Sequence, residues 1–289
     1  MDFEEALDIA QGAWELMGYS ARTRARYSLQ ISAMARNLHL APEAVTTADL
    51  KRHLVSTKRQ KSLSNSAVYS QVNAIRAFFK ALVDNGVITT NPADPLPLPK
   101  RSRKLPTYLT SDELLTLLHA CESKPRDHCL LEFIYATGVR LSEAVAMKVD
   151  SINLKEKTAL VKSGKGDKDR LVIMSEHACQ DISHYLKKRT TPSEHLFPNR
   201  SGGRLSPRYV EKMIARYARK ARISKTVTPH VLRHTFATHM LDSNVDIRAI
   251  QELLGHSSLA TTQIYTHVTP ERLRRIITSH PRETLSDKA

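Results

Sequence analysis

The sequence has few cysteines and no long apolar run. Only three of its 289 residues are cysteine, Cys121, Cys129 and Cys179, and no two of them form a C-x-x-C pair. This odd number and spacing argue against a disulfide framework and against a thiolate zinc site. No apolar stretch approaches the roughly 20 residues that a membrane-spanning helix needs, and the N-terminus is acidic where a secretory signal would be basic. The sequence therefore predicts a soluble, cytoplasmic protein whose cysteines are reduced core residues.

Two common site motifs are incomplete. Gly164-Lys165-Gly166 lacks the G-x-x-x-x-G-K-[ST] spacing of a phosphate-binding loop, and a strand is expected after it in place of a helix. His230 and His234 have the spacing of a zinc-binding helix, but Arg233 lies between them and the glutamate of H-E-x-x-H is missing. We therefore expect neither a nucleotide cofactor nor a metal.

Positive charge is what the sequence has in excess. It contains 44 Lys and Arg against 29 Asp and Glu, a formal net charge of +15. Such a balance indicates a polyanionic partner, usually nucleic acid; the alternative is a basic surface that only keeps the protein in solution. Residues 1–19 carry five acids and no Lys or Arg, whereas residues 20–104 carry fifteen bases against four acids. The basic face is therefore predicted to begin after the first helix.

Residues 1–90 have the periodicity of four amphipathic helices. We expect them over residues 2–18, from 20 or 23 onward, from 46 or 47 to 54, and over 64–84. Four such helices form a small bundle with basic edges, which fits a DNA-binding module. The side chains predicted to contact DNA here are Arg22, Arg24, Arg26, Lys58, Arg59 and Lys61.

A proline-rich segment follows the bundle. Residues 92–106 contain five prolines, so residues 91–106 are predicted to be an extended linker between a domain over 1–90 and a domain over 107–289. Four basic residues of the linker are expected to meet phosphates if the two domains close around a duplex: Lys100, Arg101, Arg103 and Lys104.

Residues 107–289 combine helices with a short β region. Helices are expected over 110–120, 125–138, 175–189, 207–223 and 246–254, and from 228 onward, and the first of them has a capping signal. Short β-prone runs at 151–154, 158–162 and 170–174 predict a small antiparallel sheet with a glycine-rich hairpin turn at 163–169. The fold class is therefore mainly α with a small antiparallel β-sheet. On the helix at 207–223, Arg208 and Lys212 are further candidates for DNA contacts.

One stretch gathers most of the reactive side chains. Thr228-Pro229 is an N-cap signal, so His230 and Arg233 are expected one turn apart on one helix face, near a helix N-terminus that favours anions. Gly255 ends the next helix and places His256 in the cap or turn, and Tyr265 follows nine residues later. A guanidinium, two imidazoles and a phenol around one anion are what phosphodiester chemistry without a metal requires.

A second arginine lies upstream. Arg140 follows a glycine helix end at Gly138, and Glu143 stands three positions later, where its carboxylate can hold the Arg140 guanidinium on a helix. The plain alternatives are a surface arginine and a solvated glutamate at a helix start. His234 and His239 are expected to satisfy buried polar contacts.

These motifs together resemble the tyrosine site-specific recombinase, or phage integrase, family. The resemblance is carried by Thr137-Gly138-Val139-Arg140-Leu141-Ser142-Glu143, His230-x-x-Arg233, Leu253-Leu254-Gly255-His256 and Thr262-Gln263-Ile264-Tyr265-Thr266-His267. The last two phrases look most like the Xer branch, which resolves chromosome dimers. The resemblance implies an N-terminal four-helix core-binding domain and a C-terminal α+β catalytic domain.

The resemblance also implies a mechanism without metal, ATP or other cofactor. Tyr265 attacks a DNA phosphorus and forms a 3′-phosphotyrosyl bond. Arg140 and Arg233 balance charge on the phosphate, His230 is the general base and His256 a phosphate ligand. Lys165 protonates the leaving oxygen, with Lys168 as the alternative. Glu143 supports Arg140.

The implied partner is double-stranded DNA with a specific recombination site. In the family, four protomers hold two duplexes, and the partner protomer can be a paralogous recombinase. Thr269 to Ile277 is predicted to be a helix that docks on a neighbour or packs on its own domain. Three alternatives remain: an integrase of a phage or mobile element with the same chemistry, a type IB topoisomerase, and a non-catalytic DNA-binding regulator.

Overall fold

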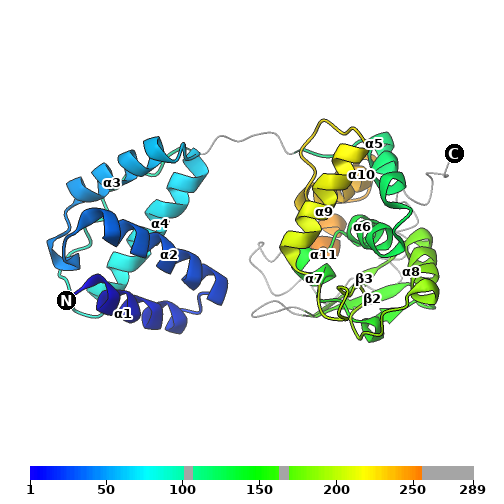
Figure 1. The fold of residues 1–289 in the computed structure, drawn as a ribbon, viewed down its shortest axis with the longest axis horizontal. Helices are drawn as coiled ribbons and strands as arrows, with labels where there is room; N and C mark the ends of the chain where they lie inside the picture. The colour runs from blue at the N-terminus through cyan, green and yellow to red at the C-terminus, as the bar shows by residue number, and fades with distance from the viewer. Residues whose placement is uncertain (101–106, 163–168, 256–289) are drawn as a thin grey trace. The chain divides into compact units, whose positions relative to one another are not determined.

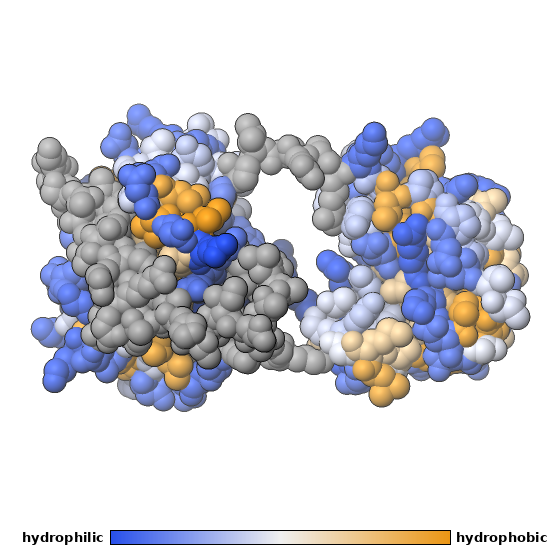
Figure 2. Space-filling model, turned by 180° about the vertical axis from the view of Figure 1, so that it is seen from behind, coloured by the Kyte–Doolittle hydropathy of each residue, from blue (hydrophilic) through white to orange (hydrophobic). Residues whose placement is uncertain are grey.

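The computed structural model describes residues 1–100, 107–162 and 169–255. The chain divides into two compact units, Met1–Lys104 and Leu105–Ala289, which are described separately below (Figure 1). Within the described ranges, no helix combines the length and the apolar character needed to cross a bilayer. In Figure 2, the coloured surface of each unit is mostly hydrophilic on the side shown, with separate hydrophobic patches.

The first unit is a bundle of four α-helices. They are α1 (Phe3–Leu16), α2 (Ala21–Leu38), α3 (Thr47–Gln60) and α4 (Asn65–Asp84), with a 3₁₀ turn at Pro42–Ala44. Each helix starts at a polar N-cap side chain that accepts backbone N–H bonds: Asp2, Ser20, Thr46 and Ser64. The apolar faces meet around Trp14, Ile31 and Phe78, all fully buried. The predicted four-helix domain is confirmed.

Helix α3 is longer than expected. It ends at Gln60, six residues beyond the predicted end at Leu54. Lys58 and Arg59 lie in its last turn, where positive charge stabilises a helix C-terminus. Lys58, Arg59 and Lys61, which are predicted to contact DNA, therefore lie at the end of a helix.

The start of the proline-rich segment packs on the first unit. Residues 92–95 form a turn instead of an extended chain, and Ala93 and Leu96 are buried in the bundle core. The guanidinium of Arg76 donates to the backbone carbonyls of Ala93 (3.3 Å), Asp94 (3.1 Å) and Leu96 (2.6 Å). Proline has no backbone N–H, so this segment has few donors for its own carbonyls. The Arg76 side chain from α4 supplies the missing donors.

The second unit surrounds a three-stranded antiparallel sheet with helices. The strands are β1 (Ile152–Asn153), β2 (Thr158–Val161) and β3 (Arg170–Ile173), in the order β1-β2-β3, with Leu160 opposite Leu171. The helices are α5 (Ser111–Cys121), α6 (Pro125–Thr137), α7 (Leu141–Ala144), α8 (Glu176–Lys188), α9 (Pro207–Lys220), α10 (Pro229–Asp242) and α11 (Ile247–Leu254). The predicted class, mainly α with a small antiparallel sheet, is confirmed, although the helix expected after Arg140 is a single turn.

Helix α6 is the centre of this unit. It packs between α10 and α8 (Figure 1), and every residue from Cys129 to Thr137 is buried. Cys121, Cys129 and Cys179 are all buried and none of the three forms a disulfide, as predicted. Burial raises the pKa of the Cys129 thiol well above its usual value and that of Cys121 to about 12. Both thiols are therefore protonated and unreactive near neutral pH.

Gly138 lets three helices meet. It ends α6 in the left-handed region, at φ +61°. A Cβ at this position would lie 2.7 Å from both Leu254 Cδ2 and Phe236 Cδ1, which belong to α11 and α10. The glycine thus serves both the backbone conformation and the close packing.

His239 fixes the start of the second unit to α10. Its Nε2 lies 2.9 Å from the carbonyl oxygen of Leu109, and its Nδ1 lies 3.0 Å from the Tyr135 hydroxyl. Because a carbonyl only accepts, Nε2 carries the proton and Nδ1 accepts from Tyr135. Thr235 accepts a further bond from the backbone N–H of Leu109 (3.0 Å). The prediction of a buried polar contact is confirmed for His239, whereas His234 is half-buried with its ring edge-on to Tyr108.

Gly138→Ala is expected to destabilise the second unit by about 2–4 kcal/mol, from left-handed strain and overpacking together. Gly86→Ala is the matched control, because Gly86 has φ +72° but no atom within 4 Å of its Cβ position; it should cost about 1–2 kcal/mol. Urea unfolding of the full chain measures both, since the single tryptophan, Trp14, reports the first unit and circular dichroism follows both. Equal losses in the two variants would contradict the packing argument.

His239 should make stability depend on pH. Burial lowers the pKa of His239, so the unfolded chain binds its proton first as the pH falls. The stabilisation is present above the ordinary histidine pKa of about 6.5 and is lost as the pH falls below it. His239→Gln keeps a donor and an acceptor but does not titrate. Between pH 7 and 5 the free energy of unfolding of this variant, measured with urea, should therefore fall less than that of the wild type. His119→Gln, at a side chain 84% exposed, should behave like the wild type. Equal slopes for His239→Gln and wild type would refute this assignment.

Candidate active site

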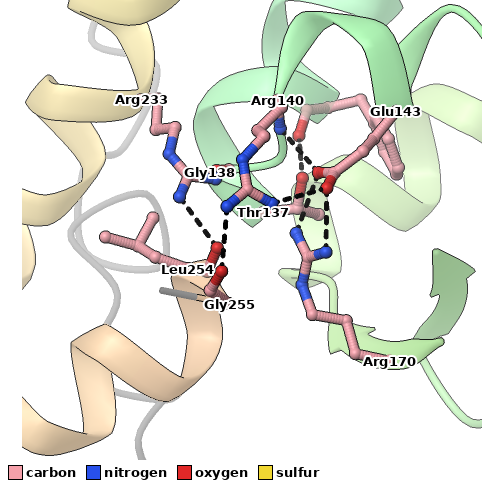
Figure 3. Close-up of polar contacts among 9 residues, drawn as sticks. Thr137, Gly138, Arg140, Glu143, Arg170, Arg233, Leu254 and Gly255 are labelled. Carbon is pink, nitrogen blue, oxygen red and sulfur yellow. Dashed lines mark hydrogen bonds and ion pairs between the residues drawn. The ribbon is translucent and has the colours of Figure 1, made fainter. Parts of the chain in front are cut away.

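The N-terminal half of α10 buries an arginine beside two helix ends. Thr228 caps the helix, Pro229 occupies its first turn, and Arg233 lies one turn further in, 8% exposed. Arg233 Nη1 donates to the carbonyl of Gly138 (2.5 Å), and its Nη2 donates to the carbonyl of Leu254 (2.8 Å) (Figure 3). Its guanidinium therefore joins the C-terminal ends of α6 and α11.

A second guanidinium binds the next carbonyl of the same helix end. Arg140 Nη2 donates to the Gly255 carbonyl (3.0 Å), next to the Leu254 carbonyl that Arg233 binds. Gly255 caps α11 in the left-handed conformation, at φ +62°. The structure thus brings together Arg140 and Arg233, from segments far apart in the sequence (Figure 3).

Glu143 holds Arg140 as its spacing predicts. Its carboxylate accepts from Arg140 Nη1 (3.0 Å) and from the backbone N–H of Arg140 (2.7 Å). The Glu143 side chain is 9% exposed, so the alternative of a solvated glutamate is wrong. Glu143 is therefore a buried anion between cationic groups.

The sequence reasoning missed a third guanidinium. Arg170, the first residue of β3, donates Nη1 to Glu143 Oε1 (2.9 Å) and Nη2 to Glu143 Oε2 (2.8 Å). The sequence pattern places this residue only in a β-prone run. The available signal was a charged residue opening an apolar strand, but the sequence alone does not name its partner.

Charge and burial set the ionisation of these groups. Burial would raise the pKa of Glu143, but hydrogen bonds from Arg170 and from the Arg140 backbone, with the nearby positive charges, lower it to about 2. Burial and the charge of Arg140 lower the pKa of Arg233 to about 10. Glu143 is therefore ionised and Arg233 protonated at neutral pH.

The cluster carries a net positive charge. Three guanidinium groups against one carboxylate leave +2, on a partly buried set of side chains beside the N-terminal half of α10. Guanidinium groups suit phosphate oxygens because their N–H groups form planar, charge-assisted bonds. The exposed His230 lies one turn before Arg233 on the same helix. This arrangement can bind a phosphodiester and stabilise negative charge that develops on it.

Several predicted site residues lie outside the described ranges. They are Lys165, its alternative Lys168, His256, Tyr265, the helix expected from Thr269 to Ile277, and the linker residues Arg101, Arg103 and Lys104. Among the residues that are described, no three His, Cys, Asp or Glu side chains gather as a metal site.

The basic residues predicted to contact DNA are mostly exposed. Exposed positions are Arg22, Arg26, Lys58, Arg59, Lys61, Lys100, Arg208 and Lys212. The exception is Arg24, whose side chain is 23% exposed and forms an ion pair with Glu15 of α1 (2.8 Å). Helix α9 buries Val210, Met213 and Ile214, so Arg208 and Lys212 lie on its outer side.

Family models match both parts of the chain. The model of the phage integrase family matches residues 107–272. The model described as phage integrase, N-terminal SAM-like domain, matches residues 7–89. The first match spans more than half of the chain and includes all four residues of the arginine and glutamate cluster.

Individual relatives agree with the family models. The chain is 36% identical to tyrosine recombinase XerC of Vibrio vulnificus over 276 residues, 92% of this chain and 87% of that protein. It resembles the crystal structure of XerA recombinase with 35% identity and a TM-score of 0.52, covering 96% and 99% of the two chains. It also resembles XerH bound to palindromic difH substrate in a post-cleavage complex, with 26% identity and a TM-score of 0.68, covering 88% and 79%. The chain therefore belongs to the phage integrase family and is a tyrosine site-specific recombinase of the Xer type.

Proposed function

We propose that this protein cleaves and rejoins DNA at a specific site through a covalent bond between Tyr265 and a 3′ phosphate. The observation that carries the proposal is the pair of guanidinium groups of Arg140 and Arg233 on the adjacent carbonyls of Leu254 and Gly255. The chain continues directly from this point to His256 and Tyr265 in the sequence. The proposed nucleophile, Tyr265, thus lies only ten positions after Gly255, the second of these two residues.

The proposed reaction is a transesterification. The Tyr265 oxygen attacks phosphorus and gives its proton to His230, while the bond to the 5′ oxygen breaks and that oxygen takes a proton from Lys165. His256 hydrogen-bonds the phosphate. In the second step the 5′ hydroxyl of a partner strand attacks phosphorus and releases Tyr265. One phosphoester bond replaces another at each step, so neither ATP nor a metal enters the balance.

Arg140 and Arg233 are proposed to stabilise the transition state. Negative charge on the nonbridging oxygens grows as the phenolic oxygen adds to phosphorus, and preorganised donors lower the energy of that state most. The net charge of +2 on the described cluster supports this role. Bonds to backbone carbonyls hold both guanidinium groups in place before DNA arrives, so little reorganisation is needed.

The proposed partner is duplex DNA held by both units. The solved relative XerH is bound to palindromic difH DNA, and the exposed basic residues of α2, α3 and α9 offer phosphate contacts here. We propose an assembly of four protomers on two duplexes, formed by this chain alone or together with a paralogous recombinase, which acts in dimer resolution of chromosomes or plasmids.

Tyr265→Phe is expected to abolish covalent attachment and leave DNA affinity unchanged, because only the nucleophilic oxygen is removed. A nicked suicide duplex carrying a candidate site traps the wild type, in buffer with EDTA, as a protein–DNA adduct on a denaturing gel. Gel retardation of the same duplex provides the binding control. An adduct formed by Tyr265→Phe would rule out this nucleophile. Supercoil relaxation without exchange between two sites would indicate a topoisomerase instead.

Arg233→Lys is expected to slow single-turnover cleavage by at least about 100-fold, since one ammonium cannot replace planar donors to two carbonyls and a phosphate. DNA affinity should change little because the charge is kept. Arg248→Lys, at an exposed arginine of α11, is the matched control and should cleave like the wild type. Full cleavage by Arg233→Lys would contradict the proposed role.

A further inference from the structure

Arg170 and Arg140 share one carboxylate. Arg170 forms two parallel hydrogen bonds to Glu143, at 2.9 and 2.8 Å, while Arg140 binds the same carboxylate through Nη1 (3.0 Å) and its backbone N–H (2.7 Å). The side chains of Arg170 and Glu143 are 15% and 9% exposed. This pair is therefore a buried, bidentate contact, the kind that fixes geometry as well as charge.

Arg170 also packs against the second support of Arg140. A Cβ on Gly255 would lie 2.8 Å from Arg170 Nε and 3.0 Å from its Cζ, so the guanidinium lies directly against the Gly255 turn. The Gly255 carbonyl accepts from Arg140 Nη2 (3.0 Å). Arg170 thus contacts both groups that hold the Arg140 guanidinium.

The position of Arg170 also costs stability. Among the described residues, its Nε is buried without a hydrogen-bond partner, a state that ordinarily destabilises a fold. A third like charge near Arg140 and Arg233 adds repulsion. Arg170 thus brings costs of its own, which its two bonds to the buried Glu143 carboxylate offset.

We propose that Arg170 is a positioning residue for Arg140: it neutralises and orients Glu143, so that Glu143 holds the Arg140 guanidinium in place without immobilising it in a tight pair. The inference rests on the proposed function. Without Arg170, Glu143 keeps a full negative charge against Arg140 alone, draws its guanidinium inward and weakens its bond to a phosphate.

Arg170→Gln should slow single-turnover cleavage of the suicide duplex by about 10- to 100-fold, the effect typical of removing a supporting partner of a functional side chain. DNA affinity by gel retardation should fall by less than threefold, as for any single charge. Arg170→Lys should recover part of the rate, because it restores the charge but not the two parallel bonds. Lys187→Gln, which removes an exposed charge from α8, is the control and should match the wild type.

A double-mutant cycle with Glu143→Gln separates positioning from general damage to the fold. If Arg170 acts through Glu143, Arg170→Gln should slow cleavage much less in the Glu143→Gln background than in the wild type. The double variant removes both charges of the Arg170–Glu143 pair, so neither of them stays buried without the other, which guards against misfolding of the single variant. Rate losses that multiply would overturn the proposal.

The pH profile gives a second readout. Arg140, Arg170 and Arg233 are the charged groups that act on Glu143, and with Arg170 present its pKa is about 2. In Arg170→Gln the effect of burial is less opposed, so this pKa rises and a larger fraction of the carboxylate is protonated at pH 5 than in the wild type. Protonation removes the charge that draws the Arg140 guanidinium inward, so cleavage by the variant should fall less steeply than that of the wild type from pH 7 to 5. Parallel profiles would refute the role of Glu143.

The outcomes distinguish the two proposals. A wild-type protein that forms no adduct on any candidate duplex counts against the proposed function. A wild type that cleaves, with Arg170→Gln cleaving at the same rate, counts against Arg170 alone.

Discussion

The C-terminal end of α11 is where the second unit is held together. The last carbonyls of a helix have no intrahelical partner, and here guanidinium groups bind two of them. One guanidinium comes from α10 and the other from the corner between α6 and α7. Two glycines in the left-handed conformation, Gly138 and Gly255, allow the close approach that these bonds require. The geometry of the arginines is thus fixed by backbone atoms, which move less than side chains.

This arrangement places like charges close together in a buried region. The lowered pKa of Arg233 reflects the cost, since burial and neighbouring guanidinium groups both disfavour its charged form. Glu143 offsets only part of the charge. An anion that binds the cluster removes the remaining repulsion, so its binding also stabilises the fold. The repulsion among the guanidinium groups lowers the free energy of unfolding of the free protein, and binding of a phosphate raises it again. Folding and anion binding are thus coupled.

The sequence predicted what depends on local rules. Ser64 and Thr228 begin helices as caps, Gly138 and Gly255 end them, and these signals are read from a few neighbouring residues. The spacing of Glu143 from Arg140 likewise gave a contact within one turn. Such features need no knowledge of the fold, because both partners lie on the same piece of chain.

What the sequence could not predict depends on distant partners. Arg170 meets Glu143 across 27 positions, and His239 meets Leu109 across 130. Arg24, which is predicted to contact DNA, forms an ion pair with Glu15 of another helix, α1, and the sequence alone does not indicate that partner. In each case the side chain has several chemically suitable partners in the sequence, and only the packing of the helices and the sheet selects one.

The bidentate pair of Arg170 and Glu143 joins the sheet to the arginine cluster. Parallel N–H bonds are directional, so a shift of β3 by about 1 Å relative to α7 would break at least one of them. In the sequence, Lys165 lies between β2 and β3. Both of these strands belong to the sheet that the pair joins to the arginine cluster. The proposed proton transfer from Lys165 to a leaving oxygen needs such a link, because a donor must lie within hydrogen-bond reach of an oxygen that the arginines are proposed to hold.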